Sequence, residues 1–117
     1  MQDHRKLKVW QRAQEKCVEV YIFTADFPAE ERYGMTAQLR KAAVSVGANI
    51  AEGSKRKSKV DKVRVFNIAE SEAAEAMSIL DVAVRLRFGG KEEAERLIGC
   101  YDELLAMLGS LYEKVLA

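Results

Sequence analysis

Residues 38–53 read QLRKAAVSVGANIAEG, and this stretch decides the fold. On a helix with 3.6 residues per turn, side chains three or four positions apart lie on the same face. The polar side chains form one such stripe: Gln38, Lys41, Ser45, Asn49 and Glu52. Most of the remaining surface is apolar. Because buried polar groups need hydrogen-bond partners, we expect this stripe to face a second polar row, a wet channel or a ligand.

We interpret the stripe first as a polar network between helices, which would fix their register. The network residues are expected to be Ser45, Asn49, Glu52, Ser71 and Glu75. Ser45 and Asn49 would bond to Ser71 or Glu75. Glu52 would pair with Arg40, Lys55 or another base. The alternative is that the stripe lines a channel or a groove for a partner.

Apolar residues at helical spacing continue through most of the chain. Pro28, the only proline, separates the first two helical patterns. Thr36 is expected to cap the second helix and Gly53 to end it. Ser58 followed by Asp61 resembles a capping box and predicts the start of the third helix. The four predicted helices span residues 7–26, 36–52, 58–88 and 91–116.

Four helices with short connections favour an all-α fold, an up-down-up-down antiparallel four-helix bundle in a single domain over residues 1–117. The third helix is apolar on several faces, so we expect it to lie at the centre of the bundle or to contribute to a subunit contact. Gly47 lies inside the second helix, where it costs about 1 kcal/mol relative to alanine. We interpret it as a point of close approach by a neighbouring helix.

The charge is unevenly distributed although the formal net charge is only +1. Residues 53–64 hold six Lys or Arg and one Asp, a local charge of +5 that leaves −4 for the remainder. The net charge excludes a histone-like protein. Cys17 and Cys100 are far apart and lie in apolar patterns, which predicts buried, reduced thiols. With no targeting or membrane-spanning run after the charged start, we expect a cytoplasmic protein.

The sequence shows no nucleophile with a matching base and acid. Its only histidine, His4, lies in a terminal segment, and residues 53–58 lack the pattern of a phosphate-binding loop. Four carboxylates of the third predicted helix, with one from the second helix across from them, could assemble a carboxylate site, but they lack the histidines of a di-iron bundle. They are Glu52, Glu70, Glu72, Glu75 and Asp81. We therefore expect no enzymatic activity, no metal site and no cofactor.

The basic run offers the strongest functional hypothesis. Each exposed Lys or Arg can neutralise a backbone phosphate, so that several together bind nucleic acid without reading its sequence. The candidate nucleic-acid-binding residues are Arg40, Lys41, Lys55, Arg56, Lys57, Lys59, Lys62 and Arg64. A solvated loop that keeps the protein in solution is the alternative. The second hypothesis is a protein-protein scaffold or accessory subunit without direct nucleic-acid binding, in which the apolar face of the third helix and the polar stripe contact subunits and partners.

Four motifs in order carry a resemblance to a known family. They are Val9 and Trp10, FPAEERYGMT at 27–36, the stretch 38–53, and Phe66, Ile68, Ala69, Ser71 and Glu75. Over residues 7–115 the chain resembles the four-helix-bundle proteins encoded by intervening sequences of bacterial 23S rRNA genes, which carry a ribosomal protein S23-like label. The family pattern often has Gly where this chain has Glu70.

The resemblance implies a cytoplasmic bacterial protein that forms a ring of identical subunits, typically a homopentamer, with no established catalytic activity. The accessory variability protein of diversity-generating retroelements is similar in fold and works with a reverse transcriptase and nucleic acid through a basic surface. The resemblance therefore implies self-association and RNA, DNA or a protein as further partners. It does not imply a component of the ribosome.

Overall fold

Four α-helices make up most of the computed structural model, which describes residues 3–117. They are α1 (Lys8–Thr24), α2 (Met35–Lys55), α3 (Lys59–Leu86) and α4 (Lys91–Leu116), with two 3-10 helices, η1 (His4–Lys6) and η2 (Ala29–Glu31). Residues 3–117 contain no strand. The prediction of an all-α fold with four helices is confirmed.

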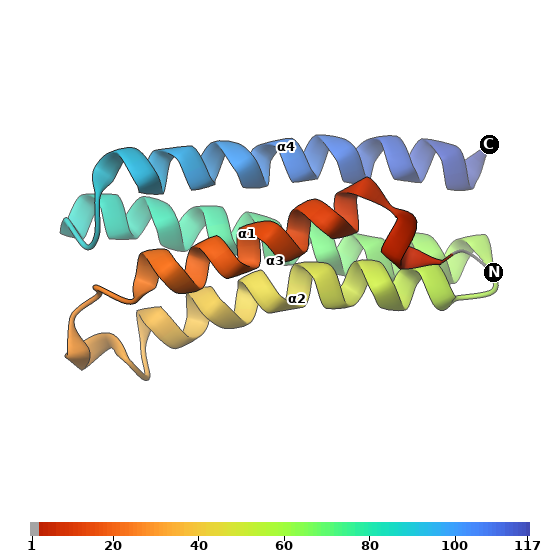
Figure 1. The fold of residues 1–117 in the computed structure, drawn as a ribbon. Coiled ribbons are helices and arrows are strands. Elements are labelled where there is room, and N and C mark those ends of the chain that lie inside the picture. The colour runs from red at the N-terminus through yellow and green to blue at the C-terminus, as the bar shows by residue number, and fades with distance from the viewer. Residues whose placement is uncertain (1–2) are drawn as a thin grey trace.

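Each connection reverses the direction of the chain (Figure 1). The α1–α2 and α3–α4 connections therefore lie at one end of the molecule. The α2–α3 connection, the start of the described chain and its C-terminus lie at the other end, which we call the termini end. The molecule measures 44 × 23 × 20 Å.

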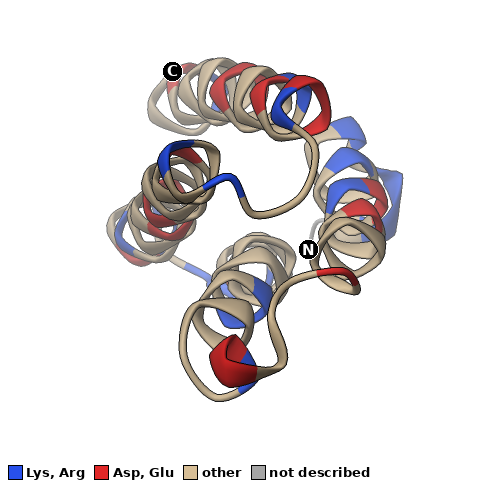
Figure 2. Ribbon diagram, turned by 90° about the vertical axis from the view of Figure 1, so that its left-hand side faces the viewer, with Lys and Arg blue, Asp and Glu red and all other residues tan. Residues whose placement is uncertain are grey.

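The helices contact one another in the order α1, α2, α3, α4 and back to α1. Seen along their axes they occupy the corners of a square (Figure 2). The edge between α2 and α3 is therefore opposite the edge between α1 and α4. The centre is filled by apolar side chains from all four helices, among them Val20, Leu39, Phe66, Leu80 and Leu104.

Helix α2 starts and ends differently from the prediction. Gly34 is its N-cap, and the Glu31 carboxylate accepts from the backbone N–H of Met35 at 3.0 Å. Thr36 is therefore a buried residue of the first turn and no cap. Gly53 does not end the helix, which continues to Lys55. A Cβ at Gly53 would lie 2.5 Å from Cε1 of Phe66, so glycine here makes room for the ring.

The predicted close approach at Gly47 is confirmed, and the neighbour is α1. A Cβ at Gly47 would lie 3.8 Å from Cβ of Ala13 and 2.2 Å from Oε1 of Gln14. The predicted N-terminus of α3 is also confirmed, because the Ser58 hydroxyl accepts from the Asp61 backbone N–H at 3.1 Å. Helix α3 ends at Leu86, where Arg87 adopts a left-handed conformation with φ 61°.

Helix α3 packs on α2 and α4 through one broad face and leaves other apolar side chains exposed. The exposed ones are Val60, Ile68, Val82 and Leu86. Both cysteines are free, and each is half-buried where the sequence predicted a buried thiol. Within residues 3–117, no helix has the length and apolarity to cross a membrane.

Candidate functional site

The basic run surrounds the connection between α2 and α3 at the termini end. We call this set the basic turn: Lys55, Arg56, Lys57, Lys59, Lys62 and Arg64. The Ser58 cap starts α3 only three residues after α2 ends. This short connection gathers the six cations on one edge of the molecule, and their roles differ.

Lys55, Lys57 and Lys59 are the free charges of the basic turn. All three side chains are exposed. In the part of the chain that the structure describes, none forms an ion pair, whereas the neighbouring arginines do. Three ammonium groups without carboxylate partners produce a local positive potential that attracts anions.

Arg56 and Arg64 are paired along their own helices. Arg56 lies 3.3 Å from Glu52, and Arg64 lies 3.7 Å from Asp61. All four side chains are largely exposed, and such surface pairs contribute at most about 1 kcal/mol. Either guanidinium can therefore leave its carboxylate for a phosphate at little cost.

Lys62 has a structural role. Its Nζ donates to the backbone oxygen of Ser54 at 2.8 Å and to that of Gly53 at 3.5 Å, and its side chain is half-buried. Both oxygens lie in the last turn of α2, where carbonyls run out of helical partners; that of Gly53 also accepts from the Arg56 backbone N–H at 3.2 Å. A positive charge there also interacts favourably with the helix dipole. Lys62 ties the start of α3 to the end of α2.

Arg40 and Lys41 lie outside the basic turn, so grouping them with it was wrong. They precede Lys55 by 15 and 14 residues in α2, which is about 21 Å or more at 1.5 Å per residue. Arg40 instead joins α2 to α1. Its Nε donates to the Thr24 hydroxyl at 2.9 Å, and its guanidinium stacks 4.6 Å above the Tyr21 ring.

The polar stripe does not form the expected network between helices. Asn49 Nδ2 donates to the Ser45 backbone oxygen at 2.8 Å, and the Ser71 hydroxyl donates to the Asn67 backbone oxygen at 3.2 Å. Both bonds stay within one helix. Glu52 does pair with a base, as expected, but this base is Arg56, the residue that follows α2, so the pair joins no second helix. The stripe lies at the surface, where water can satisfy its remaining groups.

The carboxylates of α3 interact with different partners. Glu70 accepts from the Tyr112 hydroxyl at 2.5 Å, and burial followed by this carboxylate raises the pKa of Tyr112. Partial burial and the neighbouring Glu75 raise the pKa of Glu72, while Lys41 opposes the shift. Asp81 pairs with Arg85 at 2.9 Å. Within residues 3–117, no three His, Cys, Asp or Glu side chains are close enough to hold a metal ion.

Our reading of the sequence missed three lysines at the termini end. Lys6, Lys8 and Lys114 line an open hollow of about 430 Å³ between the start of α1 and the end of α4. We call this hollow the N-terminal groove; Leu7, Val9, Met107, Ser110 and Leu111 complete its lining. The sequence could have indicated this grouping, because the start of the first helix and the end of the fourth lie at the same end of a bundle whose helices alternate in direction.

The model of the 23S rRNA-intervening sequence protein family matches residues 5–110. The chain belongs to this family. The match includes the entire basic turn and all lining residues of the N-terminal groove except Leu111 and Lys114.

A solved structure supports the fold of this 23S rRNA-intervening sequence protein. It is a Bacteroides thetaiotaomicron protein of unknown function from the S23 ribosomal protein family. The two share 26% sequence identity with a TM-score of 0.80, over 89% of this chain and 97% of the other. No curated protein matched the chain.

Proposed function

We propose that this family member is a non-enzymatic protein that binds RNA or other nucleic acid through the basic turn. In this proposal it is an up-down-up-down antiparallel bundle that works in the cytoplasm as a subunit of a homo-oligomeric, pentameric ring. The observation that carries the nucleic-acid proposal is a set of three exposed lysines that form no ion pair with any residue from 3 to 117: Lys55, Lys57 and Lys59.

Phosphate binding fits this arrangement physically. An exposed ammonium that meets a phosphate releases a condensed counterion, and the gain does not depend on base sequence. Arg56 and Arg64 can add contacts because their present partners hold them weakly. Lys62 acts indirectly by holding the turn in shape. The family description refers to 23S rRNA, which makes RNA the first probe to use.

Fluorescence anisotropy of labelled RNA over a salt series tests the proposal. The variant K55Q/K57Q/K59Q removes the three free charges without breaking an ion pair. The control R32Q/K41Q/K91Q removes three exposed cations away from the termini end, one of which, Lys91, pairs with Glu95 at 3.8 Å. We expect the turn variant to bind on the order of tenfold more weakly at low salt and to reduce the salt slope by about 2 to 3. Wild-type affinity in the turn variant would contradict the proposal.

A protein-protein scaffold is the second candidate, and an exposed apolar surface favours it. Val18 and Ile22 lie one turn apart on α1 and are 61% and 69% exposed. Tyr21 and Val44 are exposed on α1 and α2 as well. Apolar side chains gathered on a surface mark contacts between proteins more often than contacts with nucleic acid. A chain that assembles but binds no RNA at low salt would favour this candidate.

A further inference from the structure

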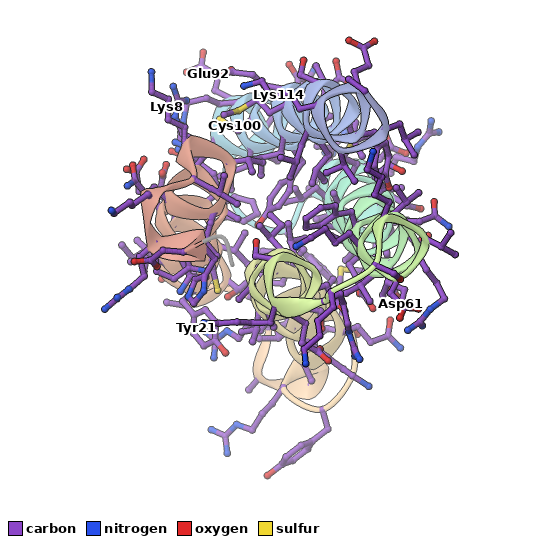
Figure 3. All side chains as sticks on the ribbon, turned by 90° about the vertical axis from the view of Figure 1, so that its right-hand side faces the viewer. Lys8, Tyr21, Asp61, Glu92, Cys100 and Lys114 are labelled. Atoms are coloured by element: carbon purple, nitrogen blue, oxygen red, sulfur yellow. The ribbon has the colours of Figure 1, made fainter. Side chains whose placement is uncertain are left out.

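The termini end carries a second group of free lysines, on the edge opposite the basic turn. Lys6, Lys8 and Lys114 are exposed and, among the described residues, form no ion pair. Figure 3 faces this end and shows Lys8 and Lys114 on the side of α1 and α4, with Asp61 of α3 on the other side. The molecule is only 23 × 20 Å across, so both lysine groups border one small surface.

The acidic side chains at this end do little to cancel these charges. Three of them are held by arginines: Asp3 by Arg5 at 3.0 Å, Glu52 by Arg56 and Asp61 by Arg64. Glu113 is exposed beside Lys114. The end therefore presents six lysines to an incoming anion. The 3-10 helix η1, which contains Lys6, packs against both α1 and α2.

The aromatic side chains are poorly placed to stack on bases at this end. The exposed tyrosines, Tyr21 and Tyr33, lie towards or in the α1–α2 connection at the other end. Trp10 is half-buried with its ring 4.9 Å from that of His4. Tyr112 is half-buried with its hydroxyl on Glu70. Proteins that bind single strands rely on exposed aromatic platforms in addition to positive charge.

We infer that the termini end binds a nucleic-acid duplex, with one phosphate row against the basic turn and the other against the N-terminal groove. This inference rests on the proposed function and specifies its ligand. The two groups of lysines lie on opposite edges of this end, so each can contact one of the two phosphate rows that border a groove. A duplex keeps its bases stacked internally and is recognised largely by shape and backbone contacts, so it needs no aromatic platform on the protein.

The N-terminal groove suits this role through its apolar lining. Leu7, Val9 and Leu111 lie along the same hollow as the three lysines. Lysine stems pack along such apolar surface and keep their ammonium groups in water. The ammonium groups therefore stay at the surface, where an incoming phosphate can reach them.

Anisotropy with two RNA probes tests the inference: a short paired duplex, and one of its strands chosen to lack self-pairing. The variants are K6Q/K8Q/K114Q for the N-terminal groove, K55Q/K57Q/K59Q for the basic turn and R32Q/K41Q/K91Q as the control. Circular dichroism and the melting temperature verify that each variant is folded. We expect wild type to prefer the duplex at equal salt. Each lysine variant should lower the salt slope for the duplex by about 2 to 3.

The outcomes separate this inference from the proposed function. If the groove variant binds the duplex like wild type while the turn variant binds weakly, the second contact is wrong and the proposed function stands. If the single strand binds as tightly as the duplex, the choice of a duplex is wrong. If the turn variant keeps wild-type affinity for both probes, the proposed function fails and the inference fails with it.

Discussion

Gly53 allows the side chain of Phe66 to pack directly against the backbone of α2. An added Cβ would lie 2.5 and 2.6 Å from two ring carbons of this fully buried residue. We predict that Gly53→Ala lowers the free energy of unfolding by about 1 to 3 kcal/mol, a typical cost of overpacking. Urea denaturation measures this change.

Gly99 is the matched control, because a Cβ there meets nothing within 4 Å. Gly99→Ala should raise the free energy of unfolding by up to about 1 kcal/mol through helix propensity. Equal effects of the two substitutions would contradict the packing role of Gly53.

Glu72 makes the stability of the protein depend on pH. Burial and Glu75 raise its pKa above the ordinary value of 4.5. The folded chain therefore holds this proton more tightly than the unfolded chain, and the free energy of unfolding falls as pH rises through the interval between the two pKa values. We predict that Glu72→Gln raises the melting temperature at pH 7 by about 1 to 2 °C, with a smaller change at pH 4.

The exposed substitution Asp102→Asn on α4 serves as the control for a lost negative charge. A rise in melting temperature for Glu72→Gln that is the same at both pH values would show that the effect does not come from the carboxylate charge.

Two hydrogen bonds, one at the start of α3 and one at the end of α2, fix the shape of the basic turn. The Ser58 hydroxyl caps α3, and Lys62 Nζ caps the end of α2. We predict that Ser58→Ala costs about 1 kcal/mol of stability, while Ser58→Asp preserves it because aspartate is also a good N-cap. Thermal unfolding of both variants provides the measurement. A loss of the same size in both would exclude the cap as its cause.

The existence of the four helices was predictable because apolar spacing and the Ser58 capping signal agree locally. Gly53 was misread, since a glycine near the end of an apolar pattern is equally compatible with a cap and with a close ring. Only packing distinguishes the two, and the ring comes from Phe66, on another helix. Likewise Thr36 does not cap α2, because the carboxylate of Glu31, in η2, accepts the backbone N–H of Met35.

The sequence predicted part of the candidate site and could not predict the rest. The basic side chains from Lys55 to Arg64 lie close together in the structure because they are neighbours in the sequence. The prediction placed Arg40 with this run because both could face the same side of the second helix. Arg40 lies about four turns before Lys55 along α2 and contacts α1 instead. The lysines of the N-terminal groove come from both ends of the chain, so only the tertiary arrangement brings them together.

Self-association is the first prediction for the whole molecule. We expect native mass spectrometry to detect an oligomer, a pentamer in our proposal. If the exposed apolar side chains of α1 form the contact, V18K/I22K should shift the population towards monomer, since buried lysine charges are costly. The control Val60→Lys changes an exposed apolar residue at the start of α3. A wild-type chain that stays monomeric at micromolar concentration would contradict the ring.

The most direct test of nucleic-acid binding by the basic turn is the slope of log affinity against log salt for an RNA duplex. It compares wild type with K55Q/K57Q/K59Q. We predict a slope that is smaller in the variant by about 2 to 3, because each lost lysine removes about one phosphate contact. Identical slopes and affinities for the two proteins would contradict the account.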